Sequence, residues 1–140
     1  MGMGFCGNFA DTVKAKFVEK TVGAKLYADF TEFVDKYGEF GVYSCITNED
    51  NLHLDKVNIS DEEAEADANI LKKVYASLCE VFHKKTGLSI EYSYHNSSDA
   101  GDRYDDIDGA AWLVSGVYEL TKAGKKYQKH INRAFFVQYG

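Results

Sequence analysis

Apolar residues recur at helical spacing through the middle of the chain, between Ser60 and Gly87. One stripe of this segment carries Leu71, Val74, Tyr75, Leu78 and Phe82. The start, Ser60-Asp-Glu-Glu63, matches a capping box with acids at the positive helix end. The end has His83-Lys84-Lys85 ahead of Gly87, which suits the C-cap. The pattern predicts a long helix that lays one face on a sheet.

Two shorter segments near the N-terminus have the same period. Residues 8–22 place Phe9, Val13, Phe17 and Val18 at helical spacing, with Asn8 as a suitable N-cap. Residues 24–37 repeat the pattern and stop at Gly38. We therefore expect two helices before residue 38.

Other segments favour strands. Residues 40–47 and 51–58 are short runs with strand-forming composition, separated by the turn-favouring residues 48–51. Residues 88–95 alternate apolar and polar side chains, as expected of a half-buried strand.

The end of the chain suggests a β-hairpin. Residues 112–120 and 127–135 face each other across Lys122-Ala-Gly-Lys125. In that register Val114 pairs with Arg133, Trp112 pairs with Phe135, and Lys129 and Arg133 share the apolar face. These cations could anchor an anionic ligand framed by Trp112 and Tyr118. We favour another explanation over ligand binding: the two side chains extend past the sheet edge or pair with an internal acid. Long charged side chains are almost never fully buried unless they are paired.

The order of these elements indicates an α+β fold. Chain length fits one domain over residues 1–140. We expect a two-layer domain in which the N-terminal helices and the long central helix pack on a curved, mainly antiparallel five-stranded sheet.

Composition narrows the function classes. A formal net charge of −6 argues against a general nucleic-acid binder. No apolar run approaches the roughly 18 residues of a membrane span. Three cysteines without a Cys-x-x-Cys spacing, and no signal-peptide pattern, indicate reduced thiols in the cytoplasm and no metal site. No phosphate loop or other local catalytic motif is present, so we expect no cofactor.

Charge is unevenly distributed along the chain. An acidic loop over residues 99–109 holds Asp99, Asp102, Asp105, Asp106 and Asp108. A solvated turn is favoured over a calcium site there, because the loop lacks the complete EF-hand pattern. Residues 49–67 are also acidic, whereas Lys122, Lys125, Lys126, Lys129 and Arg133 have no acid among them. The domain is expected to be dipolar, with the five aspartates as partner-binding residues.

Two functional hypotheses follow. The first is a small, acidic, cytoplasmic protein-binding module, inhibitor-like or adaptor-like, that occupies a basic partner surface without catalysis; a homodimer is left open. The second is a small-molecule-binding or enzymatic domain with a pocket on the concave face of the sheet. Its anchors are Arg133 and Lys129, and its walls are Trp112, Tyr118 and Tyr92.

Overall fold

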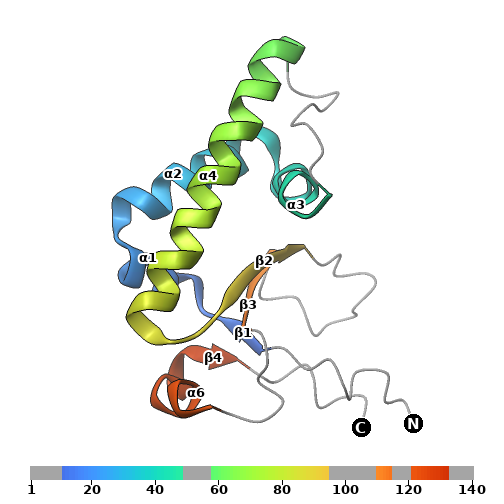
Figure 1. The fold of residues 1–140 in the computed structure, drawn as a ribbon. Coiled ribbons are helices and arrows are strands. Elements are labelled where there is room, and N and C mark those ends of the chain that lie inside the picture. The colour runs from blue at the N-terminus through green and yellow to red at the C-terminus, as the bar shows by residue number, and fades with distance from the viewer. Residues whose placement is uncertain (1–10, 49–57, 95–109, 115–120, 133–140) are drawn as a thin grey trace, which may run out of the picture.

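The computed structural model describes residues 11–48, 58–94, 110–114 and 121–132. These residues form a mostly helical α+β arrangement (Figure 1). The described helices are α1 (Ala15–Val22), α2 (Ala24–Tyr37), α3 (Glu39–Asn48), α4 (Asp61–Thr86) and α6 (Lys122–Lys126). The described strands are β1 (Asp11–Val13), β2 (Ile90–Tyr94), β3 (Ala110–Val114) and β4 (Ile131–Asn132), and a 3₁₀ turn covers Gln128–His130. None of these helices combines the length and apolar character that a membrane crossing requires.

The long helix α4 agrees with its sequence pattern at both ends. The side chain of Ser60 accepts a hydrogen bond from the backbone N–H of Glu63 at 3.1 Å. Gly87 adopts φ 80°, and its N–H donates to the carbonyl of His83 at 2.7 Å, so it caps the C-terminus in a conformation that favours glycine. With 26 residues the helix is about 39 Å long. It contacts α1, α2, α3 and β2, and so spans most of the described fold.

The sheet has the antiparallel order β2-β3-β1-β4. Because β4 contains only two residues, three described strands have three residues or more. The prediction of a five-stranded sheet is therefore wrong. Residues 51–57, assigned to one of the expected strands, lie outside the described residues.

The first difference lies at the N-terminus. Residues 11–13 were expected in a helix, but they form β1, which pairs with β3 on one side and β4 on the other. Thr12 and Val13 are each only 3% exposed, as expected of an interior strand. Helix α1 begins two residues later, at Ala15. Val13 fits the helical spacing of the sequence, but hydrogen bonding of β1 to β3 on one side and to β4 on the other makes this segment a strand.

The second difference is α3, which replaces the strand expected over residues 40–47. Gly38, at φ 86°, separates it from α2: its N–H donates to the Val34 carbonyl and its carbonyl accepts from the Val42 N–H. Val42 and Cys45, three residues apart, are completely buried on one helical face. Packing against α2 and α4 outweighs the strand-forming composition of this segment.

The prediction of a C-terminal β-hairpin is also wrong. β3 pairs with β1 and β2, and Val114 lies opposite Asp11 and Ile90 instead of Arg133. The expected loop is helix α6, because the side chain of Thr121 accepts from the Gly124 N–H at 3.0 Å and caps it. Ile131 of β4 pairs with Val13 of β1. The N-terminal strand thus lies between the segments that the hairpin would have joined.

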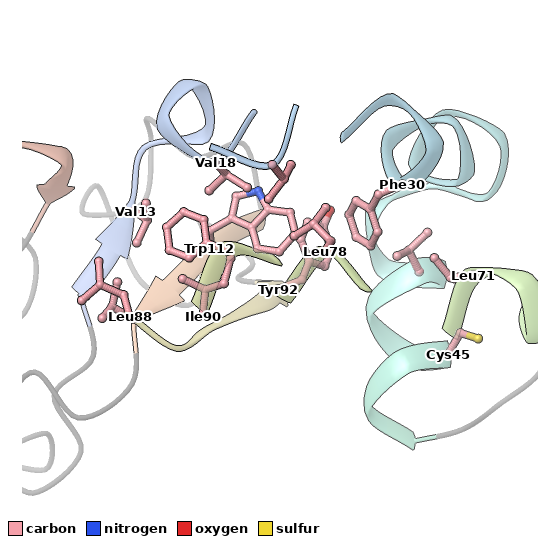
Figure 2. Close-up of a cluster of buried hydrophobic side chains, with 14 of the residues drawn as sticks. Val13, Val18, Phe30, Cys45, Leu71, Leu78, Leu88, Ile90, Tyr92 and Trp112 are labelled. Atoms are coloured by element: carbon pink, nitrogen blue, oxygen red, sulfur yellow. The ribbon is translucent and has the colours of Figure 1, made fainter. Parts of the chain in front are cut away.

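Aromatic rings fill the space between the sheet and the helices (Figure 2). Trp112 of β3 points toward Phe30 of α2 and Tyr92 of β2, and its ring centroid is 5.3 Å from each of theirs. The hydroxyl of Tyr75 accepts from the backbone N–H of Tyr92 at 2.9 Å, which joins α4 to β2. Burial of such large rings contributes strongly to the stability of a core.

Candidate interaction surfaces

Opposite charges occupy the two ends of α4. Its N-terminal turns carry Asp61, Glu62, Glu63, Glu65 and Asp67, and its last turn carries His83, Lys84 and Lys85. This arrangement complements the helix dipole, which is positive at the N-terminus and negative at the C-terminus. The helix therefore separates an acidic region from a basic one within the described fold.

Part of the acidic region joins α4 to α2. The Lys36 ammonium lies 2.9 Å from Glu63 Oε2 and 2.9 Å from Asp67 Oδ2. The buried Tyr37 donates its hydroxyl hydrogen to the same Asp67 oxygen at 2.5 Å. Burial, together with the neighbouring carboxylate, raises the pKa of Tyr37 to about 12. Burial alone would raise the pKa of Asp67, but hydrogen bonds from Tyr37 and Lys36 outweigh it and lower that pKa.

The remaining acids, Asp61, Glu62 and Glu65, lie on an exposed surface of α4 together with Ala66 and Ile70. We call these five residues the acidic face. Within the described part of the chain, no lysine or arginine lies at ion-pair distance from its three acids. Ile70 is 51% exposed although it is a large apolar residue. The acidic face therefore combines uncompensated negative charge with an exposed aliphatic side chain.

The opposite end of the molecule carries the lysine cluster, which we define as Lys14, Lys20, Lys85, Lys126 and Lys129. All five side chains are exposed. Lys14 belongs to the link between β1 and α1, and its Nζ donates to the Lys129 carbonyl at 3.2 Å. In Figure 1, α6 and β4 lie beside the C-terminal end of α4. Tyr127 strengthens this contact, since its hydroxyl lies 3.5 Å from the Lys85 carbonyl.

Three rings lie among these lysines. The Phe17 and His130 rings are stacked in parallel, with centroids 3.9 Å apart and planes inclined by 3°. The Tyr127 ring centroid is 5.4 Å from that of Phe17, and the Lys126 ammonium is 5.4 Å from the Tyr127 centroid. Burial, followed by the nearby Lys129, Lys14 and Lys20, lowers the pKa of His130. The imidazole is thus held toward its neutral form.

The residues expected to bind a small molecule are not gathered around one described site. Lys129 is exposed on the 3₁₀ turn, so it does not lie on the apolar face of a hairpin strand, where the expected register put it. Trp112 and Tyr92 are buried and pack edge to face against each other. Tyr118 and Arg133 lie outside the described residues. Ligand binding by these residues stays a prediction.

Asp99, Asp102, Asp105, Asp106 and Asp108 lie outside the described residues, so their assignment to a partner-binding surface stays a prediction.

Several surface residues had no distinguishing signal in the sequence. Lys14, Lys20 and His130 looked like ordinary solvent-facing positions, because no motif connects them. The asymmetry of charge was visible, with four lysines and no acid over residues 121–132. The contribution of the N-terminal lysines depends on pairing between β1 and β4, which no local pattern indicates.

Comparisons with protein families, with curated proteins and with solved structures give no match. The two charged surfaces are therefore the features of the described structure that indicate a function.

Proposed function

We propose that this protein is a small cytoplasmic binding module that acts by occupying a basic surface of a partner protein, without catalysis. The supporting observation is the acidic face, where Asp61, Glu62 and Glu65 are exposed beside Ile70. Charges of one sign accelerate encounter with an oppositely charged surface and disfavour other partners. Exposed aliphatic area supplies contact energy once the surfaces meet.

The acidic face lies on a helix whose opposite side packs against the rest of the described fold. Ala64, Ala68 and Leu71 are buried on the inner side of α4, whereas Ala66 and Ile70 are on its exposed side. The contacts of Lys36 with Glu63 and Asp67 hold this end of the helix against α2. A partner would therefore meet a surface that needs little ordering, which reduces the entropic cost of binding.

Two cysteines in the described part of the chain support the cytoplasmic part of the proposal. Cys45 is buried and Cys79 is half-buried, and neither is in a disulfide. Reduced cysteines are usual in that compartment.

Asp61, Glu62 and Glu65 also stabilise α4 through the helix dipole, so a test must separate binding from folding. The variant Asp61→Asn/Glu62→Gln/Glu65→Gln removes three negative charges and keeps the side-chain shapes. The matched control, Glu19→Gln/Glu80→Gln/Glu91→Gln, removes the same charge from exposed positions outside the acidic face. Thermal melting of each purified variant establishes that it is folded before binding is measured.

Immobilised wild type and both variants are incubated with lysate of the source cells at about 50 and 300 mM salt, a range over which exposed charges become strongly screened. We expect a basic protein to be captured by the wild type and the control at low salt, and to be released at high salt. Loss of capture by the acidic-face variant supports the proposal once purified partner reproduces the three results. Equal capture of the partner by all three chains contradicts it, as does capture of no basic protein.

A further inference from the structure

The lysine cluster is assembled from three parts of the sequence that the fold brings together. Lys14 is the N-cap of α1 and Lys20 lies in its last turn. Lys85 lies in the last turn of α4, and Lys126 and Lys129 follow Thr121 in the C-terminal segment. Backbone contacts hold the parts in place: the Lys14 N–H donates to the His130 carbonyl at 3.1 Å. Close packing of α6 on the end of α4 adds to this, since a Cβ built on Gly87 would lie 3.1 Å from the Ala123 Cβ.

The positive charge of this cluster is not neutralised within the described residues. None of its five lysines lies within ion-pair distance of a described aspartate or glutamate. By contrast, Lys36 at the other end of the molecule contacts two carboxylates. Maintaining five neighbouring ammonium groups costs repulsion energy that a polyanion would relieve.

Aromatic rings distinguish this surface from a purely electrostatic one. His130 is half-exposed, and its ring already stacks in parallel on Phe17. Tyr127 is also half-exposed and lies beside Lys126. Proteins that bind single strands without sequence preference combine a positive surface along the phosphates with aromatic side chains on which bases stack.

We propose that the lysine cluster binds single-stranded nucleic acid, with the lysines contacting phosphates and the His130 ring extending its stack onto a base. The net charge of −6 argued against such a function, but it averages over the whole chain and misses the local cluster. Lysines supply point charges that suit a flexible phosphate backbone without reading sequence. The cluster lies at the other end of α4 from the acidic face, so this function is separate from the proposed protein-binding surface.

Fluorescence anisotropy with labelled 20-nucleotide oligo(U) and oligo(dT) tests the proposal. Five phosphate contacts, each with a slope of about 0.7, predict about 100-fold weaker binding at 200 mM than at 50 mM salt. Lys14→Gln/Lys129→Gln should weaken binding about tenfold at 50 mM salt and lower the slope by about 1.4. The control, Lys25→Gln/Lys73→Gln, removes the same charge from exposed positions outside the cluster and should leave both values unchanged.

A second pair of variants isolates stacking. His130→Ala removes the ring and should weaken oligonucleotide binding at least fivefold, whereas His130→Phe retains a ring and should bind within twofold of wild type. A duplex of the same length should bind more weakly than the single strand, because its bases are already stacked.

Three results overturn the proposal. They are absence of oligonucleotide binding at 50 mM salt, equal weakening by the cluster and control variants, and duplex binding as tight as single-strand binding. Sedimentation with phosphatidylserine vesicles provides the remaining comparison: vesicle binding without oligonucleotide binding would assign the cluster to a membrane surface instead.

Discussion

Tyr37 and Asp67 are thirty residues apart in sequence, and the phenol of Tyr37 donates a hydrogen bond to the Asp67 carboxylate. The bond joins the last residue of α2 to the second turn of α4. Lys36 contacts the same carboxylate oxygen, so consecutive residues of α2 use one acid of α4.

The Tyr37→Phe substitution should destabilise the protein by about 1–3 kcal/mol, because it removes a charge-assisted hydrogen bond at a buried position. Urea unfolding measures the change. Tyr127→Phe is the matched control: the hydroxyl of Tyr127 lies 3.5 Å from the Lys85 carbonyl in a more exposed setting, so a loss below about 0.5 kcal/mol is expected. Equal losses for the two variants would contradict the importance of the Tyr37 hydrogen bond.

Asp67 should make stability fall in acid. Its pKa in the folded protein is lowered from the ordinary value of 3.8. The stability it contributes is therefore present above pH 3.8 and lost as pH falls through the folded-state pKa. Urea unfolding of wild type and Asp67→Asn between pH 2.5 and pH 6 measures this effect. The stability difference between them should shrink toward low pH, and a difference independent of pH would refute the assignment.

Tyr37 should have the opposite effect in alkali. Its pKa is raised from the ordinary value of 10.0 to about 12 in the folded protein. The neutral phenol is favoured by folding, so its contribution is complete below pH 10 and is lost as pH rises toward 12. Relative to Tyr37→Phe, wild type should lose stability over that interval. Ultraviolet titration of tyrosinate in the two proteins checks this. The wild type should show one phenol that ionises near pH 12 and that Tyr37→Phe lacks.

Gly87 and Ala123 should be energetically coupled. Gly87→Ala introduces a side chain at φ 80° and a Cβ only 3.1 Å from that of Ala123, so we expect destabilisation of about 1–3 kcal/mol. In the Ala123→Gly background the steric part of this cost disappears and only the backbone part remains. A double-mutant cycle by urea unfolding should therefore give a smaller loss for Gly87→Ala in that background. Strict additivity would show that α6 does not pack on the end of α4.

The aromatic core should be sensitive to a single truncation. Phe30 is fully buried between Tyr75, Tyr92 and Trp112, so Phe30→Ala should cost about 3–5 kcal/mol. Trp112 is the single tryptophan in the chain, and its fluorescence reports this environment directly. The control, Ile70→Ala, truncates a half-exposed residue of α4 and should leave Trp112 emission unchanged. A red-shifted emission in the control would contradict the use of Trp112 fluorescence as a report of packing around Phe30.

Local sequence determined α4 most completely. Its apolar stripe, its Ser60 cap and its Gly87 terminator all depend on residues within a few turns of each other. The same holds for α2 and for the alternating segment that contains β2. The prediction of opposite charges at the ends of α4 also needed only the order of residues.

Tertiary structure decided the remaining elements, because strand partners and helix packing depend on residues distant in sequence. Thr12 and Val13 join a sheet only because β3 and β4 are available on both sides. Val42 and Cys45 pack as a helical face because α2 and α4 lie beside them. The sequence by itself determined how many lysines the C-terminal segment carries, but pairing of β1 with β4 decided that Lys14 lies beside Lys129.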